Sequence, residues 1–288
     1  MIINSYAKVN LYLKVIRKRK DHYHSIKTCF ERISLCDKIV LTCLPEKKIE
    51  IISDSKDIPL DHTNLAYKAS VRLQKAYRIQ KGVRIRIIKR IPVGAGLGGG
   101  SSNAAAVLMA LNTLWKLRLS GRAILKHANA IGSDVAFFTY NTAFALGTGR
   151  GEKISPLKRF QKVKLWHILV VPRLKVSTPL IYKKWDTFEK LTKPGLDGKL
   201  LYSALRENDL SLLRQAICNS LEPVTISLYP EVNRIKEKLL QLNIPAVSMS
   251  GSGPAVFGVV SSRKEAVKAS AQLTQEDATW QIFTTCTV

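Results

Sequence analysis

Residues 91–112 limit the possible folds of this chain more than any other segment. The segment places five glycines between Gly94 and Gly100, then two serines, and then an alanine-rich stretch without a helix breaker. Glycine permits positive φ angles and lets the backbone approach a ligand without a Cβ in the way. A glycine loop that ends at a helix start presents unpaired N–H groups and the positive end of the helix dipole. The segment therefore predicts an anion site, and phosphate is the anion that suits it best.

The loop is expected between a strand and a helix. Residues 83–87 alternate apolar side chains with arginines, which predicts a half-buried strand that ends before Pro92. Ser101 or Ser102 is the expected N-cap of a helix that continues over residues 104–114. The capping-box acid three residues after the cap is missing, which fits a helix start that meets a phosphate.

Three alternative interpretations of the loop fit less well. The GxxxxGK[ST] phosphate motif is absent, because no lysine follows the glycines. A GxGxxG pattern does occur at 94–99, but a dinucleotide-binding fold needs an acid about 20 residues later to hold the ribose. The chain has no Asp or Glu between Asp61 and Asp134. A flexible linker is also disfavoured, because an apolar helix follows at once.

Length and composition limit the class of protein. A chain of 288 residues with 46% hydrophobic side chains predicts two domains with full cores. No apolar run reaches the roughly 18 residues of a membrane span, and the alternating N-terminal residues do not resemble a signal peptide. The cysteines are odd in number without CxxC, and the histidines lack metal-ligand spacing. We therefore expect a reduced, cytoplasmic protein without structural zinc.

The formal net charge of +25 makes nucleic-acid binding a second hypothesis. The basic residues are spread along the chain, however, only 7% of residues are aromatic, and no RNP, KH or zinc-finger pattern occurs. A solvated basic surface explains the charge as well, and some of it can attract polyanionic nucleotide substrates. We expect no obligatory nucleic acid.

Apolar periodicity predicts the remaining elements. Residues 7–15 alternate, so Val9 and Leu11 are expected on one face of a strand and Lys8 and Asn10 on the other. Further strands are predicted at 38–43, 49–52 and 167–171, helices at 65–77, 122–130, 177–185 and 233–242, and loops at 147–152, 193–195 and 250–254.

One isolated acid suggests a catalytic role. From His62 to Ser133 the chain has thirteen Lys or Arg residues and no carboxylate, and Asp134 then follows in a glycine-flanked turn. In phosphoryl transfer a carboxylate can accept the proton of the attacking hydroxyl, while a lysine offsets charge. Lys8 is a candidate for that lysine. The ordinary alternatives are a helix cap for Asp134 and a solvent-exposed strand lysine for Lys8.

Three segments together resemble the motifs of the GHMP kinases, the superfamily of galactokinase, homoserine kinase, mevalonate kinase and phosphomevalonate kinase. They are AKVN at 7–10, PVGAGLGGGSSNAA at 92–105 and SMSGSGP at 248–254, in that order along the chain. The resemblance implies an α+β, two-domain GHMP kinase fold: a ribosomal protein S5 domain 2-like N-terminal domain and an α/β C-terminal domain. We expect these at 1–153 and 154–288, with the last strand (about 279–288) returning to the first domain.

The GLGGGSSNAA form, with Tyr23-His24 after AKVN, resembles the members that phosphorylate a cytidine-diphosphate-linked methylerythritol in the non-mevalonate isoprenoid pathway. The resemblance implies ATP and Mg²⁺ as cofactors, with transfer of the γ-phosphate to the 2-hydroxyl, and a monomer or homodimer without membrane attachment. A homoserine or mevalonate type of kinase is the alternative, but its substrates have no base that Tyr23, His24 and Tyr182 would bind.

The resemblance also implies roles for individual residues. Asp134 would be the catalytic base and Lys8 its partner, and Ser101 and Ser102 would lie near Mg²⁺. The ATP phosphates would be bound by Pro92, Val93, Gly94, Ala95, Gly96, Leu97, Gly98, Gly99, Gly100, Ser101 and Ser102. The substrate would be bound by Asn10, Tyr23, His24, Thr178, Tyr182, Gly251, Ser252 and Gly253. His22 departs from the family, which usually has glycine there, so the backbone of the cytidine pocket is expected to shift.

Overall fold

A long antiparallel hairpin begins the fold in the computed structural model, which describes residues 1–188 and 198–288. β1 (Ile2–Lys18) pairs along its length with β2 (His24–Leu44). The register shifts between Asn10 and Tyr12, and such a bulge turns the following side chains. Leu11 and Tyr12 consequently belong to one buried cluster, so the strict alternation predicted for residues 7–15 is wrong beyond Asn10.

The remaining elements follow in chain order. They are β3 (Ile49–Ser53), α1 (Leu65–Ala76), β4 (Gly82–Ile88), α2 (Gly99–Leu114), α3 (Gly121–Asn129), α4 (Val135–Phe138), β5 (Phe144–Gly149), β6 (Lys153–Pro156), η1 (Lys158–Phe160), β7 (Trp166–Val171), α5 (Thr178–Trp185), α6 (Gly198–Glu207), α7 (Leu210–Ala216), β8 (Cys218–Asn219), α8 (Glu222–Leu228), α9 (Pro230–Gln241), β9 (Ala246–Met249), β10 (Val256–Val260), α10 (Arg263–Glu276) and β11 (Gln281–Cys286). The positions of the strands and helices predicted from periodicity are confirmed. The loop predicted at 147–152 is wrong in its first half, because residues 147–149 belong to β5, and the loop predicted at 193–195 lies outside the described residues.

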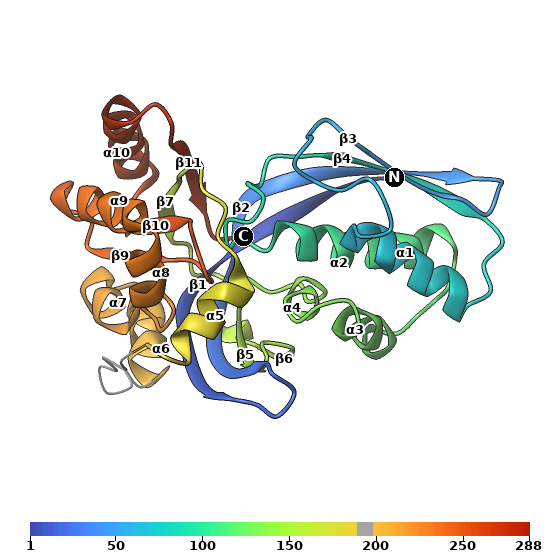
Figure 1. The fold of residues 1–288 in the computed structure, drawn as a ribbon, viewed down its shortest axis with the longest axis horizontal. Helices are drawn as coiled ribbons and strands as arrows, with labels where there is room; N and C mark the ends of the chain where they lie inside the picture. Colours follow the sequence, from blue (N-terminus) through green and yellow to red (C-terminus); the bar gives the residue numbers. More distant parts are fainter. Residues whose placement is uncertain (189–197) are drawn as a thin grey trace.

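The first sheet has seven strands, with β3, β4, β2, β1 and β8 in order and β5 and β6 branching from β2. β2 is long enough to pair with β4 near one end and with β5 near the other. Helices α1 to α4 lie along one face of this sheet (Figure 1). The alanine-rich α2 is buried over most of its length against them, which explains why its sequence is apolar almost all round.

The second sheet has four strands in the order β11, β7, β10, β9, with α9 and α10 packed against it (Figure 1). Every pairing that the structure describes in this sheet is antiparallel, so this half is α+β in type as well. β11 pairs with β7 in this sheet, contrary to the expectation that the last strand returns to the first domain, although Thr287 just beyond it bridges Ile33 of β2. The predicted division after residue 153 stays a prediction. β6 and β8, which come at or after that boundary, both contribute to the first sheet.

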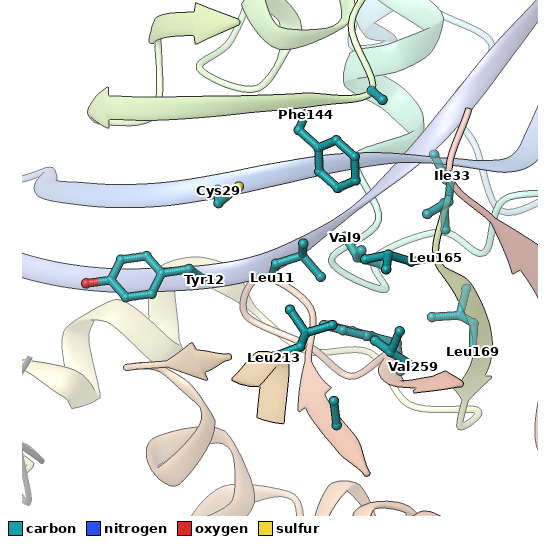
Figure 2. Close-up of a cluster of buried hydrophobic side chains, with 14 of the residues drawn as sticks. Val9, Leu11, Tyr12, Cys29, Ile33, Phe144, Leu165, Leu169, Leu213 and Val259 are labelled. Atoms are coloured by element: carbon teal, nitrogen blue, oxygen red, sulfur yellow. The ribbon is translucent and has the colours of Figure 1, made fainter. Parts of the chain in front are cut away.

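A shared core joins the two sheets. Val9 and Leu11 of β1 and Phe144 of β5 lie in one buried cluster with Leu169 of β7 and Val259 of β10 (Figure 2). Burial of large aliphatic and aromatic side chains from both sides stabilises the junction by about 1.5–3 kcal/mol for each residue. The two sheets are therefore held together by packing of this shared core.

The helix start at the glycine loop differs from the prediction. α2 begins at Gly99, with Gly98 at the N-cap, so Ser101 and Ser102 lie inside its first turn and neither is the cap. Gly98 has φ +70°, which glycine adopts readily. No side chain of the described chain caps this end. The first-turn N–H groups of a 16-residue helix are therefore open to a ligand.

Of the helices in the described chain, none combines the length and hydropathy that crossing a membrane requires. In the same residues, no three or more His, Cys, Asp or Glu side chains gather in a way that could hold a metal ion. The five cysteines are free thiols.

Candidate active site

Lys8 is buried, with an exposed fraction of 3%, although an exposed strand lysine is the more common case. Its ammonium group donates to Asn10 Oδ1 at 2.6 Å and to the Gly96 carbonyl at 2.7 Å. It also lies 3.7 Å from Asp134 Oδ2. Burial lowers the pKa of Lys8, and the nearby Asp134 carboxylate partly opposes this. The lysine thus links β1, the glycine loop and the turn before α4.

Asp134 lies at the first turn of α4 with about a third of its side chain exposed. Its side chain makes no capping hydrogen bond to the described chain, although it occupies the N-cap position. The ordinary alternative of a helix cap is therefore not what the geometry shows. The carboxylate instead faces Lys8 at the edge of a cavity, where it can accept a proton from a bound hydroxyl.

The glycine loop is held against two other segments by its backbone. The Lys8 N–H donates to the Leu97 carbonyl at 3.0 Å, and the Ala255 N–H donates to the Ala95 carbonyl at 3.3 Å. Gly96 has φ +77°, and a Cβ there would lie 2.1 Å from the Ser250 carbonyl oxygen. Glycine is thus required at this position, because any side chain would push the third motif away from the first two.

The third motif, Ser250–Pro254, closes the site from the second sheet. Asn219 of β8 donates through Nδ2 to the Met249 carbonyl at 2.7 Å and to the Gly251 carbonyl at 2.8 Å. The hydroxyls of Thr178 and Ser252 are 2.7 Å apart, which joins this loop to α5. Sequence reasoning missed Asn219, because a two-residue strand gives no periodic signal.

A buried carboxylate anchors the other end of the glycine loop. Asp37 of β2 accepts hydrogen bonds from the N–H groups of Arg90 and Ile91 at 2.7 and 2.8 Å. It also receives Lys89 Nζ at 2.6 Å and Asn103 Nδ2 at 2.9 Å. Both the entry to the loop and the first turns of α2 are therefore fixed to one fully buried side chain. Sequence reasoning missed this residue too.

An aromatic group forms another part of the cavity lining. The His24 ring stacks on Tyr182 of α5, with ring centres 4.9 Å apart and an angle of 29° between the planes. Tyr23 lies on the turn between β1 and β2, is 56% exposed, and has the Arg150 guanidinium 4.8 Å from its ring centre. A flat aromatic ligand can stack on such surfaces.

His22 has φ +63°, in the left-handed region. This explains why a glycine would suit the position, since non-glycine residues rarely adopt that conformation. The backbone still turns there, because Arg19 N–H bonds to the Tyr23 carbonyl at 2.8 Å. His22 therefore occupies a glycine-type conformation.

One cavity of about 590 Å³ brings most of the predicted residues together. Its lining includes Lys8, Asn10, Tyr23, His24, Gly96, Gly98, Asp134, Thr178, Tyr182, Gly251 and Ser252. These residues come from both halves of the chain and from elements and loops that are distant in sequence. A cavity of this size suits a small molecule with a few polar anchors.

The other predicted ligand residues lie outside the lining of this cavity. Ala95 and Leu97 are buried in the shared core and offer the site only their backbone. Ser102 is buried and accepts a hydrogen bond from Ser5 Oγ at 2.7 Å, whereas Ser101 is half-buried. The remaining members of this group are Pro92, Val93, Gly94, Gly99, Gly100 and Gly253.

Asn10 holds Lys8 in place. Its Oδ1 accepts from the Lys8 ammonium, and its Nδ2 donates to Thr28 Oγ1 at 2.8 Å. The Thr28 hydroxyl in turn donates to the Tyr12 carbonyl at 2.7 Å. This series of hydrogen bonds, which reaches Thr28 on β2, fixes the rotamer of Lys8.

Comparisons with known proteins identify the family. The family model for the GHMP kinases N terminal domain matches residues 64–142, and that for the GHMP kinases C terminal domain matches residues 201–278. A 4-diphosphocytidyl-2-C-methyl-D-erythritol kinase of Geobacillus kaustophilus is 43% identical over 90% of this chain and 87% of its own length.

Solved structures give the same result. A crystal structure of a 4-(cytidine 5'-diphospho)-2C-methyl-D-erythritol kinase superposes with a TM-score of 0.84 at 32% identity, and each chain is covered completely. A homoserine kinase from Cytophaga hutchinsonii has a TM-score of 0.71 at 20% identity, covering all of this chain and 94% of its own. The second likeness shows the fold alone.

Proposed function

The chain belongs to the GHMP kinase family, and from this membership we propose that it transfers the γ-phosphate of ATP to the 2-hydroxyl of 4-diphosphocytidyl-2-C-methyl-D-erythritol. The single observation that carries the proposal is one cavity that is lined both by Lys8 and Asp134 and by an aromatic group. The substrate in the names of its relatives has two matching groups. Its alcohol would react beside Lys8 and Asp134, and its base would stack on the aromatic side chains.

The glycine loop and the start of α2 are suited to hold the triphosphate. Backbone N–H groups at a helix N-terminus bind phosphate oxygens, and the helix dipole adds to the attraction. Gly94 has φ +70°, and a Cβ there would meet no atom of the described chain within 4 Å, so the loop is open on that side. The basic surface of the chain further attracts a polyanionic nucleotide.

Asp134 and Lys8 act on the acceptor hydroxyl. The carboxylate accepts the hydroxyl proton as the oxygen attacks phosphorus, and the lysine stabilises negative charge that spreads over the transferred group. Their 3.7 Å separation leaves the carboxylate close to the lysine without a tight ion pair. Because Asn10 and Gly96 hold the ammonium, the lysine is oriented before substrate binds.

Mg²⁺ belongs to the proposal as the partner of ATP. Magnesium is usually held by one or two protein oxygens together with substrate phosphates and water, so the lack of a three-residue metal cluster in the described chain is compatible with it. Ser101 is the hydroxyl best suited to contribute, since the Ser102 oxygen already bonds to Ser5. When bound, the ion neutralises phosphate charge.

A coupled assay of ADP release tests the proposal. The purified protein should release ADP with 4-diphosphocytidyl-2-C-methyl-D-erythritol and not with mevalonate or homoserine at the same concentration. The two other alcohols carry no base for Tyr182 and His24 to contact. ADP release that is equal with all three, or greatest with homoserine or mevalonate, would show that the acceptor assignment is wrong.

A further inference from the structure

His24 has a carboxylate partner that its sequence neighbourhood does not reveal. The imidazole Nε2 lies 2.7 Å from Asp186 Oδ1, at the C-terminal end of α5 and 162 residues away along the chain. The other carboxylate oxygen of Asp186 receives Lys18 Nζ at 2.6 Å. Tyr182 stacks on the imidazole ring, and Trp185 meets it edge-on at 5.7 Å. The ring is therefore held in one orientation.

This contact decides which ring nitrogen carries the proton. Burial acts to raise the pKa of Asp186, but hydrogen bonds from His24 and Lys18 outweigh it and hold the pKa below its usual value. Asp186 is thus ionised near neutral pH and can only accept hydrogen bonds. A neutral imidazole must then carry its proton on Nε2, because that nitrogen donates to the carboxylate. Nδ1 is left with a lone pair.

Nδ1 is the nitrogen that a ligand can reach. It has no hydrogen-bond partner in residues 1–188 and 198–288. It is also not fully buried, because it is absent from the set of buried polar atoms that lack a partner. His24 lines the cavity described above. His24 thus brings to the cavity lining an imidazole of fixed orientation whose Nδ1 is free to accept a hydrogen bond.

We propose that Asp186 is a positioning residue that makes the site selective for cytosine over uracil, by holding His24 in the tautomer whose Nδ1 accepts a hydrogen bond from the 4-amino group. This inference rests on the proposed function. Uracil carries a 4-oxo group at that position, which is itself an acceptor and would face the Nδ1 lone pair. A site built to accept a hydrogen bond discriminates strongly against an analogue that lacks the donor.

Asp186→Asn tests the tautomer directly. The amide can donate to Nε2 as well as accept from it, so the proton can move to Nδ1 and the 4-oxo group becomes acceptable. The ratio of kcat/KM for the cytidine-diphosphate-linked substrate to that for its uridine-diphosphate-linked analogue should fall by about tenfold or more. A fall of kcat/KM by the same factor for both substrates would overturn the proposal, because a purely structural role predicts that result.

Lys18→Met is the matched control. It removes the other partner of Asp186 and leaves the carboxylate bonded to His24. The cytidine-to-uridine ratio should therefore stay within about twofold of the unsubstituted protein. A loss of selectivity equal to that of Asp186→Asn would contradict the tautomer argument.

Nitrogen NMR of the unsubstituted protein gives a readout that needs no substrate. At pH 8, histidine labelled with ¹⁵N should show the proton of His24 on Nε2, and Asp186→Asn should shift the population toward Nδ1. A proton on Nδ1 in the unsubstituted protein would overturn the proposal even if the kinase activity is as proposed. If the acceptor substrate is instead misassigned, the NMR result stands while the ADP-release assay fails.

Discussion

In the first part of the cavity lining, Lys8 is 3% exposed, and its ammonium contacts β1, the glycine loop and the turn before α4. In the second part, Tyr23 is 56% exposed on a turn, and its partner Arg150 comes from another turn. The first part is held by backbone hydrogen bonds from Lys8 and Ala255 to the glycine loop. The second is held mainly by side chains.

The difference has a physical reason. Phosphoryl transfer depends on positioning charges to a fraction of an ångström, so the reacting part must be rigid and desolvated. Stacking on a flat base tolerates small displacements, because its energy varies slowly with sliding. Substitutions in the first part should therefore cost turnover or folding, and substitutions in the second should cost substrate affinity.

The largest effect is expected from Asp134→Ala. Loss of the proton acceptor should lower kcat by about 10³-fold, equivalent to about 4 kcal/mol. Titration calorimetry should still detect ATP binding, because the glycine loop is proposed to bind the phosphates without this side chain. Glu237→Ala on the exposed face of α9 is the control and should retain full turnover. Undiminished kcat in Asp134→Ala would remove the carboxylate from the mechanism.

Gly96→Ala should be the next most damaging. Its positive φ and the 2.1 Å approach to the Ser250 carbonyl should together lower the free energy of unfolding by about 3 kcal/mol. Gly94→Ala is the matched control, because it shares a positive φ but meets no described atom; it should cost about 1 kcal/mol. Urea unfolding measures both. Equal losses would show that the contact between the glycine loop and the third motif does not contribute to stability.

Tyr182→Ala tests the second part of the lining. Loss of one stacking surface should raise KM for the cytidine substrate by about tenfold, within the 1–3 kcal/mol typical of base stacking, while KM for ATP stays within about twofold. Leu180→Ala, an exposed position on the same helix, should change neither constant. Equal rises in both KM values for Tyr182→Ala would mean that the two parts of the lining are not separable.

The smallest effect is a pH dependence of stability at Lys8. Because burial lowers its pKa in the folded protein, the unfolded chain binds more protons between that lowered value and the ordinary 10.5. Stability should therefore rise with pH across this window, by at most about 1.4 kcal/mol per pH unit for one proton. Urea unfolding of the unsubstituted protein and of Lys8→Met should show this slope only in the former. The same slope in both would mean that Lys8 is not the group responsible.

Much of the first part of the lining could be predicted from the sequence, because its constraints act on the backbone. A glycine loop between an alternating strand and an alanine-rich helix strongly favours a phosphate site, and the family predicted from the three motifs is confirmed. The prediction that Ser101 or Ser102 is the N-cap is wrong. The helix begins earlier, after Gly98, which has no side chain that could identify it as a cap. Lys8 could be placed on a strand, but its burial depends on contacts with the glycine loop and the turn before α4, which are distant in sequence.

The supporting residues could not be predicted from one sequence. Asp37 and Asn103 are 66 residues apart, and His24 and Asp186 are 162 apart. Local periodicity carries no information on such pairs. The short strand that contains Asn219 is likewise defined only by its parallel neighbour β1. The roles assigned to the individual cavity residues remain predictions.

A crystal structure with a non-hydrolysable ATP analogue and the cytidine substrate would decide whether the two parts of the cavity lining divide the reaction as proposed. We expect the triphosphate along residues 94–102 at the start of α2, with the acceptor hydroxyl between its terminal phosphate and Asp134. A triphosphate bound elsewhere, or an acceptor hydroxyl out of reach of that carboxylate, would contradict the proposed mechanism.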